Sequence, residues 1–230
     1  MGRRVRLRSR LRIIYLALAL TLAFYFLYGC QKGKGFLYQK PIFRETGNTP
    51  RSVTAADFNK DGFIDAAVAN FSPDDGVSLF LGDKDGRLSY KGRFDTGKDP
   101  FFITSADLNL DGRVDIITAD SGSNDISILY GKGDGDFSIP ESIETGRSPR
   151  SVVVSDMNGD KWPDLAVVNS LDNSISIYLG DKEGGFAFMP DLKTGLHPYS
   201  AAIGYFNRDK KPDLAVANVE SNDIMIFHGD

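Results

Sequence analysis

Three acidic nonapeptides hold the residues of this chain that are best suited to chemistry. They run from Asp57 to Asp65 (DFNKDGFID), from Asp107 to Asp115 (DLNLDGRVD) and from Asp156 to Asp164 (DMNGDKWPD). Each has Asp at positions 1, 5 and 9 and Asn at position 3. Oxygen-bearing side chains that alternate along a tight loop suit a hard cation such as Ca²⁺, which takes about six to eight oxygen ligands. Asp and Asn also form hydrogen-bonded turns without a metal, but a turn alone does not explain Asp at all three positions together. We therefore predict metal sites in these loops.

The loops belong to a repeat. A fourth, degenerate copy spans Tyr205 to Asp213 (YFNRDKKPD), and the first residues of the four copies are 50, 49 and 49 residues apart. A fixed period of this size is typical of stacked or radial repeat proteins.

Each repeat predicts four short strands. A strand rich in Ala and β-branched residues follows each acidic loop, and a polar loop separates it from a second apolar run. The first set covers residues 64–70, 114–120, 163–169 and 212–218, and the second covers residues 77–81, 126–130, 175–179 and 224–228. Gly-rich turns lead to outer strands that begin with Leu88, Phe137 or Phe186, and TGxxP recurs at Thr46, Thr96, Thr145 and Thr194 before the next inner strand. Four antiparallel strands with apolar central strands indicate an all-β fold, a β-propeller of four-stranded blades with four repeats.

The ends of the repeat region favour a closed ring. The fourth unit stops after its third strand, whereas residues 36–46 (FLYQKPIFRET) match the outer-strand segment 88–96 (LSYKGRFDT). Pairing of the N-terminal strand (36–46) with the last blade, beside residues 224–228, would leave no open sheet edge. The alternative is that the chain is a fragment of a larger propeller, since propellers have about four to eight blades.

Residues 1–29 are predicted to be a signal peptide or membrane anchor. Six arginines precede an apolar run of 16 residues, Ile13 to Tyr28, which is shorter than the roughly 20 residues of a membrane span. The run ends in Leu-Tyr-Gly-Cys, which resembles the lipobox of bacterial lipoproteins and makes Cys30, the sole cysteine, the expected lipidation site. Tyr28 departs from the small or β-branched residue usual at its position, so an uncleaved anchor stays open. Both alternatives place residues 31–230 outside the cytoplasm, at the outer membrane or cell surface, with residues 30–35 as a short linker and residues 36–230 as the propeller.

The charge of the rest of the chain excludes some partners. Without the six N-terminal arginines, 21 basic residues face 31 acidic ones, a net charge of −10. A body this acidic argues against nucleic acid as a partner. An enzyme is also disfavoured, because the only histidines are His197 and His228 and no Ser/His/Asp or Cys/His arrangement is readable.

With four in-register copies, the chain resembles the FG-GAP (VCBS-type) repeats of integrin α-subunit propellers and of many bacterial surface proteins. The resemblance covers essentially all of residues 35–230. It implies that each nonapeptide is a calcium loop between the first two strands of a blade, with side-chain ligands at positions 1, 3, 5 and 9 and a carbonyl ligand at position 7. The implied ligands are Asp57, Asn59, Asp61, the Phe63 carbonyl and Asp65; Asp107, Asn109, Asp111, the Arg113 carbonyl and Asp115; and Asp156, Asn158, Asp160, the Trp162 carbonyl and Asp164.

The later loops depart from this pattern. Gly62 and Gly112 at position 6 permit a positive φ, but the third loop has Lys161 there, and a non-Gly residue in that conformation costs about 1 kcal/mol. The fourth loop has Tyr205 at position 1 and Lys210 at position 6. We expect two calcium sites in the first two loops, a weaker third site and an empty fourth loop, with the ions acting as structural staples rather than catalysts.

Ligand binding is expected on the face opposite the metal loops, which the TGxxP loops should share with the polar loops near Asp74, Asn124, Asp172 and Asn222. The resemblance implies this, because the corresponding face binds ligand in integrins. Arg and aromatic side chains are enriched in binding hot spots, and those at the variable positions around TGxxP are Arg51, Phe101, Arg150, His197 and Tyr199. The resemblance favours protein interaction or adhesion. A lectin-like carbohydrate binder, stacking sugars on Phe101, Tyr199 or Trp162, is the alternative.

Overall fold

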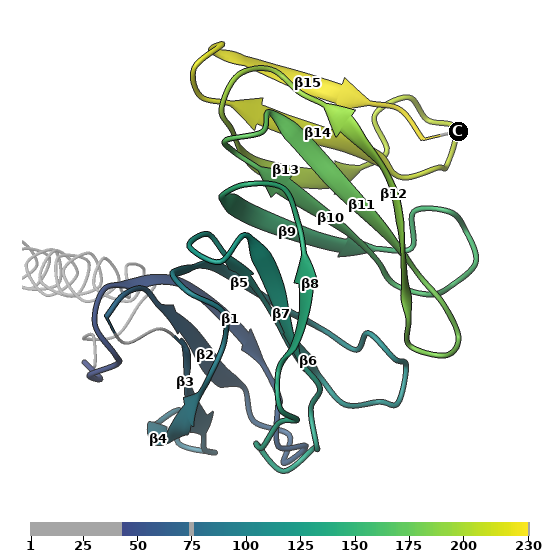
Figure 1. Cartoon of the computed structure of the whole chain (residues 1–230). Helices are drawn as coiled ribbons and strands as arrows, with labels where there is room; N and C mark the ends of the chain where they lie inside the picture. The colour runs from purple at the N-terminus through teal and green to yellow at the C-terminus, as the bar shows by residue number, and fades with distance from the viewer. Residues whose placement is uncertain (1–42, 74–75, 230) are drawn as a thin grey trace, which may run out of the picture. The chain divides into compact units, whose positions relative to one another are not determined.

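The computed structural model describes residues 43–73 and 76–229, and the chain divides into two units, Met1–Phe43 and Arg44–Asp230. The described part of the second unit contains fifteen β-strands and no helix. The strands form four antiparallel sheets of consecutive strands, called blades 1 to 4 here (Figure 1). Blade 1 contains β1 (Pro50–Ala56), β2 (Asp65–Asn70), β3 (Gly76–Gly82) and β4 (Leu88–Phe94), and blade 2 contains β5 (Pro100–Ala106), β6 (Asp115–Asp120), β7 (Asp125–Leu129) and β8 (Glu141–Glu144). Blade 3 contains β9 (Pro149–Ser155), β10 (Asp164–Asn169), β11 (Ser174–Gly180) and β12 (Phe186–Lys193), and blade 4 contains β13 (Pro198–Gly204), β14 (Asp213–Asn218) and β15 (Asp223–Phe227).

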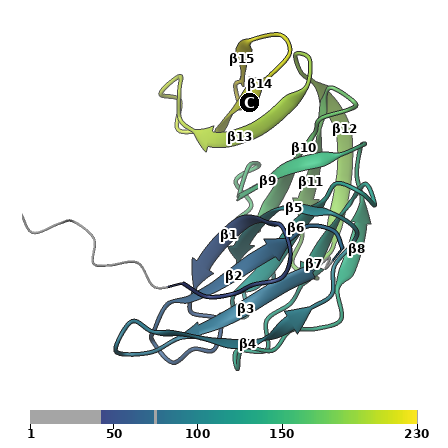
Figure 2. The ribbon, with the colours of Figure 1, turned by 90° about the vertical axis from the view of Figure 1, so that its left-hand side faces the viewer.

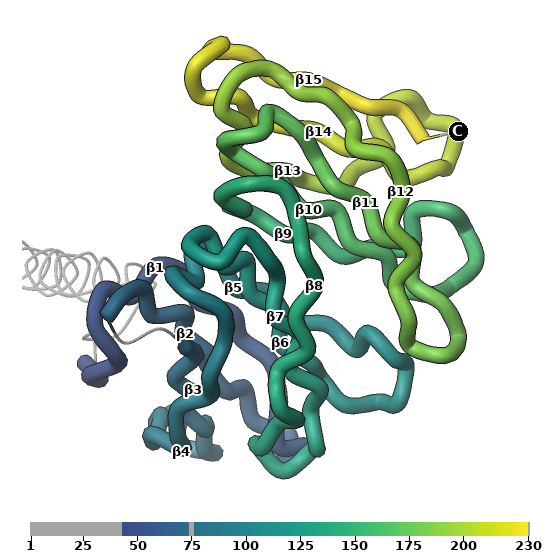
Figure 3. Tube along the Cα trace, viewed as in Figure 1, coloured from purple at the N-terminus to yellow at the C-terminus, as the bar shows by residue number. Residues whose placement is uncertain are grey.

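Each blade is built in the order predicted from the sequence. Figure 2 shows β1 to β4 side by side, and the tube in Figure 3 lets the chain be followed from one blade into the next. The first strands of successive blades contact each other, β1 with β5, β5 with β9 and β9 with β13. All six residues of β6 and of β10 are buried, as expected for a strand that is covered on both faces.

Three apolar clusters hold neighbouring blades together. Leu79 of blade 1 packs in a cluster with Ile103 and Ile116 of blade 2. Equivalent clusters join blade 2 to blade 3 and blade 3 to blade 4. Face-to-face packing of sheets through their apolar faces is the propeller arrangement that the repeat predicted.

The outer strand of blade 2 begins later than expected. The sequence placed its start at Phe137, by analogy with Leu88 and Phe186, which do begin β4 and β12. Phe137 instead makes a single bridge to Gly131, and β8 starts at Glu141. Pro140 immediately precedes β8 and has no backbone N–H to donate to the ladder.

Closure of the ring is not shown by the described residues. The predicted closing strand (36–46) lies mostly outside them, and within them β15 pairs only with β14. The predicted signal or anchor, Cys30 and the 30–35 linker also lie outside the described residues. Within residues 43–73 and 76–229, no helix has the length and hydropathy that crossing a membrane requires.

Candidate metal loops and an arginine-lined pocket

The acidic loops join the first two strands of each blade, where the sequence placed them. In the first loop the Asp61 N–H donates to Asp57 Oδ1 and Asn59 Oδ1, each at 3.1 Å, and Asn59 Nδ2 lies 2.8 Å from Asp61 Oδ2. The side chains at positions 1, 3 and 5 are therefore gathered around one amide. The second loop repeats the arrangement at Asp107, Asn109 and Asp111.

The third and fourth loops are built differently at position 1. In the third, Asp156 accepts from the N–H groups of Gly159 and Lys161, while the Asp160 N–H donates to Asn158 alone. In the fourth, the Asp209 N–H donates to Asn207, and Tyr205 at position 1 supplies no carboxylate. Only in the first two loops does the position 5 N–H donate to the side chains of both positions 1 and 3. The contact between the Asn at position 3 and the Asp at position 5 persists in the third and fourth loops.

The backbone of all four loops is the same despite these changes. Position 6 has a positive φ in each: 87° at Gly62, 78° at Gly112, 79° at Lys161 and 72° at Lys210. This confirms the left-handed conformation expected of Lys161. Position 4 also has a positive φ in each loop. The sequence did not reveal this, because only Gly159 is a glycine there; the others are Lys60, Leu110 and Arg208.

Asp at position 9 acts first as a brace between strands. Asp65 is 1% exposed, and its two carboxylate oxygens accept from the Phe58 and Gly82 N–H groups, each at 2.8 Å. The same pair of bonds is made by Asp115, Asp164 and Asp213 in the other blades. Because Asp213 keeps them in the degenerate fourth loop, the recurrence of Asp at position 9 has a reason that does not involve metal.

Burial raises the pKa of the position 9 carboxyl groups in the first three loops. Burial raises the pKa of Asp65 and Asp164, and it raises the pKa of Asp115 to about 6, against the lowering effect of the backbone N–H donors. The carboxylates at positions 1 and 5 raise the pKa of Asp65 and Asp115 further, because nearby like charges disfavour ionisation. A cation beside such a cluster would relieve this repulsion.

The donor set of the first two loops fits Ca²⁺ in chemical type. It consists of carboxylate, amide and carbonyl oxygens, the ligands that hard cations prefer. Among the described residues, no group of three or more His, Cys, Asp or Glu side chains is placed to hold a metal. The predicted ligand sets depend on one Asn and one backbone carbonyl each in addition to their carboxylates.

The TGxxP loops lie with the polar loops on one face, as the sequence predicted. The Ser148 N–H donates to Asn124 Oδ1 at 2.9 Å, and the His197 N–H donates to Asn173 Oδ1 at 2.8 Å. Arg147 makes an ion pair with Asp172 at 2.7 Å. Asp74 lies outside the described residues. The Gly of each TGxxP is required by close packing, since a Cβ on Gly47 would lie 2.8 Å from the Asn70 side chain.

Four of the five predicted ligand-face residues meet in one pocket of about 330 Å³. Arg51, Phe101, Arg150 and Tyr199 occupy the same position in the four inner strands, and Ser52, Phe102, Ser151 and Ser200 follow them. Phe101 and Tyr199 meet edge to face with ring centroids 5.6 Å apart. The guanidinium carbons of Arg150 and Arg51 lie 4.1 Å and 5.6 Å from the centre of the Phe101 ring.

The other two residues predicted to bind ligand lie elsewhere. His197 does not line the pocket and faces Glu220, with Nδ1 3.4 Å from Oε1. Trp162 belongs to the third acidic loop, and its N–H donates to Asp160.

Comparison with protein families decides the classification. A profile described as FG-GAP-like repeat matches three overlapping segments, residues 57–118, 107–167 and 156–216. The chain belongs to the FG-GAP-like repeat family. Each match begins at the first Asp of an acidic loop, so the loops and the strands after them carry the family pattern.

Solved structures share the fold of this FG-GAP-like repeat protein at low identity. A functionally unknown protein from Desulfotomaculum acetoxidans matches with a TM-score of 0.59 at 19% identity, over 77% of this chain and 54% of that one. A protein from Lactobacillus plantarum matches with a TM-score of 0.53 at 18% identity, over 78% and 56%. A periplasmic gluconolactonase of Pseudomonas aeruginosa matches with a TM-score of 0.54 at 12% identity, over 78% and 56%. The chain thus spans a little over half the length of these neighbours. A search of curated proteins finds no match.

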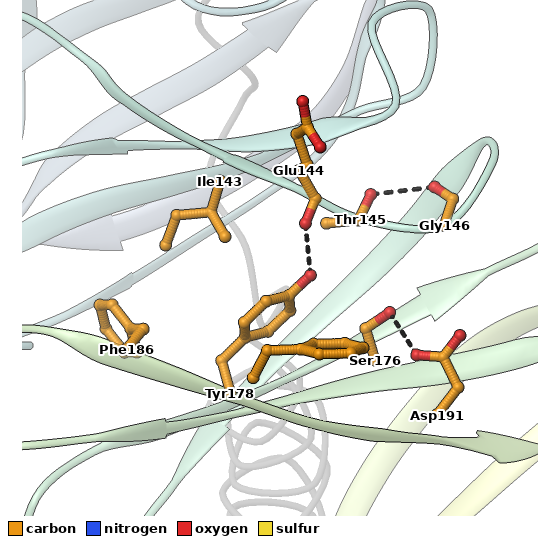
Figure 4. Close-up of a pocket in the computed structure, with 9 residues that line it drawn as sticks. Ile143, Glu144, Thr145, Gly146, Ser176, Tyr178, Phe186 and Asp191 are labelled. Carbon is orange, nitrogen blue, oxygen red and sulfur yellow. Dashed lines mark hydrogen bonds between the residues drawn. The ribbon is translucent and has the colours of Figure 1, made fainter.

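A second pocket of the FG-GAP-like repeat unit lies between blades 2 and 3 and was missed by sequence reasoning (Figure 4). It has a volume of about 470 Å³ and is lined by residues 143–146 of blade 2 and by the Tyr178, Phe186, Phe188 and Asp191 side chains of blade 3. The Tyr178 hydroxyl donates to the Glu144 carbonyl, and Ser176 Oγ donates to Asp191 at 2.9 Å. These residues come from β8 and the TG that follows it and from β11 and β12. Only the folded sheets bring the two blades together there.

Proposed function

We propose that this chain is an exported, membrane-anchored, calcium-stabilised FG-GAP-like propeller that acts as a protein-interaction or adhesion module. The observation that carries the proposal is the pocket formed by equivalent positions of the four inner strands. Oxygen-rich loops stand at the other ends of those strands, so one end is suited to structural ions and the other to a ligand. Binding sites are commonly concave and aromatic with few polar groups.

Calcium would be held in the first two loops by the side chains at positions 1, 3, 5 and 9 and the carbonyl of Phe63 or Arg113. A bound Ca²⁺ would supply positive charge that offsets the repulsion among the gathered carboxylates. The third loop would bind more weakly because Lys161 brings a cation to its position 6. The fourth loop would remain empty.

The location follows from the N-terminal sequence. Six arginines followed by an apolar run and Cys30 support export, with attachment to the outer membrane or cell surface through a lipid on Cys30 or through an uncleaved segment. We also propose that residues 36–46 complete blade 4 beside β15. A fragment of a larger propeller is the alternative.

The calcium part is tested by thermal melting of the full chain in calcium and in chelator. We expect calcium to raise the melting temperature by several degrees, because a ligand that binds only the folded state stabilises it. The rise should be lost when Asp61→Ala and Asp111→Ala are combined, and it should persist in Asp209→Ala, the matched change in the fourth loop. A melting temperature that ignores calcium would overturn the calcium part of the proposal.

Carbohydrate binding is the second candidate, and the pocket in Figure 4 favours it. Phe188 is 60% exposed beside Tyr178, and the Asp191 carboxylate is within the same pocket. Aromatic faces with nearby carboxylates suit sugar rings and their hydroxyls. Binding to a glycan array that is lost in Phe188→Ala would support carbohydrate binding. If the unaltered chain binds no glycan on the array, this candidate is wrong.

We propose binding rather than catalysis. His197 faces Glu220, and His228 lies 3.3 Å from the buried brace Asp213. Neither histidine lines the two pockets described above, so neither is placed to act on a ligand bound there.

A further inference from the structure

The pocket at the starts of β1, β5, β9 and β13 has an unusual charge for this protein. Arg51 and Arg150 both line it, and no Asp or Glu is among its lining residues. Neither arginine forms an ion pair with any described residue. In a body with a net charge of −10, this pocket is therefore a local cationic site.

Arg150 packs against Phe101 but lacks a hydrogen-bond partner at Nε. Its guanidinium lies over the Phe101 ring, with Cζ 4.1 Å from the centroid, while Nε is buried and has no hydrogen-bond partner. Arg150 also lines the pocket, where an anionic acceptor can contact its terminal guanidinium N–H groups. A charge-assisted hydrogen bond of this kind is stronger than a neutral one.

The aromatic residues limit what else can accompany the anion. Arg150 covers one face of Phe101, so a sugar cannot stack on that face. Tyr199 is 44% exposed and meets Phe101 edge to face, which leaves apolar surface beside the guanidinium groups. The volume of about 330 Å³ is that of a small site.

We propose that this pocket binds the carboxylate of an acidic side chain of a partner polypeptide. The carboxylate lies between the guanidinium groups of Arg51 and Arg150, and the neighbouring apolar part of the partner contacts Tyr199 and the edge of Phe101. The inference rests on the proposed interaction function and names the chemistry that its ligand presents. A single carboxylate is favoured over an extended polyanion because the net negative charge of the rest of the chain repels a polyanion.

The test uses the full chain, labelled with ¹⁵N, and follows the arginine Nε–H signals by NMR. The probe is the capped dipeptide acetyl-Asp-Phe-amide, and acetyl-Asn-Phe-amide is its neutral match. We expect the acidic dipeptide to shift the Arg150 and Arg51 signals and to bind at least tenfold more tightly than the neutral one, because the neutral amide forms no charge-assisted bond. Arg150→Gln should abolish this preference, while Arg147→Gln, on the same face but outside the pocket, should keep it.

Other outcomes overturn the proposal. Equal binding of the two dipeptides, or shifts at Arg147 instead of Arg150, would show that the pocket does not select a carboxylate. Inorganic phosphate that shifts the same signals at lower concentration than the acidic dipeptide would assign the pocket to a free oxyanion. Melting temperatures of both variants in calcium check that they fold, and the calcium response of the chain tests the proposed function separately.

Discussion

Asp120 ends β6 at a position that Asn holds in the other three blades. The equivalents are Asn70, Asn169 and Asn218, and all four side chains are buried. Asp120 Oδ2 accepts from Ser127 Oγ at 2.6 Å and from the Gly97 N–H at 3.1 Å, while its Oδ1 has no partner. Burial raises the pKa of Asp120 from 3.8 to about 7, with a smaller contribution from nearby Asp125.

We predict that Asp120→Asn stabilises the protein at pH 8 and changes little at pH 4. The folded protein holds the Asp120 proton up to about pH 7, whereas the unfolded chain loses it near pH 4. Stability contributed by Asp120 is therefore present at low pH and is lost as pH rises from about 4 to 7. The full difference corresponds to up to about 4 kcal/mol. Urea unfolding at the two pH values measures it.

Asn169→Asp in blade 3 is the matched reverse change. It should introduce a loss of stability of the same sign between pH 4 and 8, because Asn169 is buried at the equivalent strand position. An Asp120→Asn variant whose stability keeps the pH slope of the original chain would contradict the prediction.

At the residue scale, the sequence could identify the acidic loops but not which of their carboxylates connects the strands and which gather oxygen atoms in the loop. Recurrence marked Asp65 and Asp57 equally, yet only the folded sheets show that Asp65 bridges the Phe58 and Gly82 amides. Gly82 is 17 residues away along the chain, and no local pattern predicts that contact. The convergence of four residues could be anticipated, because they hold the same position in each repeat and the inner strands of the blades contact each other. They are Arg51, Phe101, Arg150 and Tyr199.

The acidic loop and the strands it joins form one structural element with two functions. Position 9 connects the loop to the turn after the third strand, whereas positions 1, 3 and 5 gather oxygens in the loop itself. The fourth loop keeps the first function through Asp213 and lacks Asp at position 1. The two functions can therefore be separated by substitution.

We predict that Asp115→Asn lowers the melting temperature in chelator as well as in calcium, because it breaks one of the bonds to the Leu108 and Gly131 N–H groups, whereas Asp107→Asn lowers it only in calcium. An amide at Asp115 can accept from only one of the Leu108 and Gly131 N–H groups, and the buried donor left over costs about 1–3 kcal/mol. Asp107 is in the loop, where removing its charge weakens the calcium site.

Asp213→Asn in the fourth loop is the control for the brace. It should reproduce the calcium-independent loss of Asp115→Asn. An Asp115→Asn variant that melts like the unaltered chain in chelator would show that the brace contributes nothing without metal.

At the element scale, the strands were predictable wherever the repeat was regular. The bounds of β2, β6, β10 and β14 agree with the predicted strands to within one or two residues. β8 was not: only the bridge between Phe137 and Gly131 precedes Glu141, and β8 has four residues where β4 has seven and β12 has eight. A repeat therefore predicts strand bounds only where each copy keeps the same backbone hydrogen-bonding pattern.

For the whole molecule, the decisive observation is a pair of apolar faces left open at the two ends of the blade series. Ile126 and Ile175 are fully buried against the following blade, but the equivalent Ile224 of blade 4 is 69% exposed. Ile103 and Val152 are buried against the preceding blade, but the equivalent Val53 of blade 1 is 63% exposed. Because the repeats are equivalent, the Ile224 face and the Val53 face have the complementary shapes of two blades that pack.

We predict that these two faces are covered in solution, since exposed apolar faces that match each other tend to associate. Ile224→Asp and Val53→Asp should each lower the free energy of unfolding by at least about 2 kcal/mol, the scale of burying one such side chain. Ile139→Asp, at a residue that is 90% exposed in the loop before β8, should have little effect. Thermal melting and sedimentation of the full chain then show how the two faces are covered.

If the chain is a monomer and both changes destabilise it, blade 4 packs against blade 1, as the four-bladed ring requires. If the chain is a dimer and both changes dissociate it, the faces are buried between two copies. If neither change affects melting or mass, the faces are open in solution and the prediction is wrong.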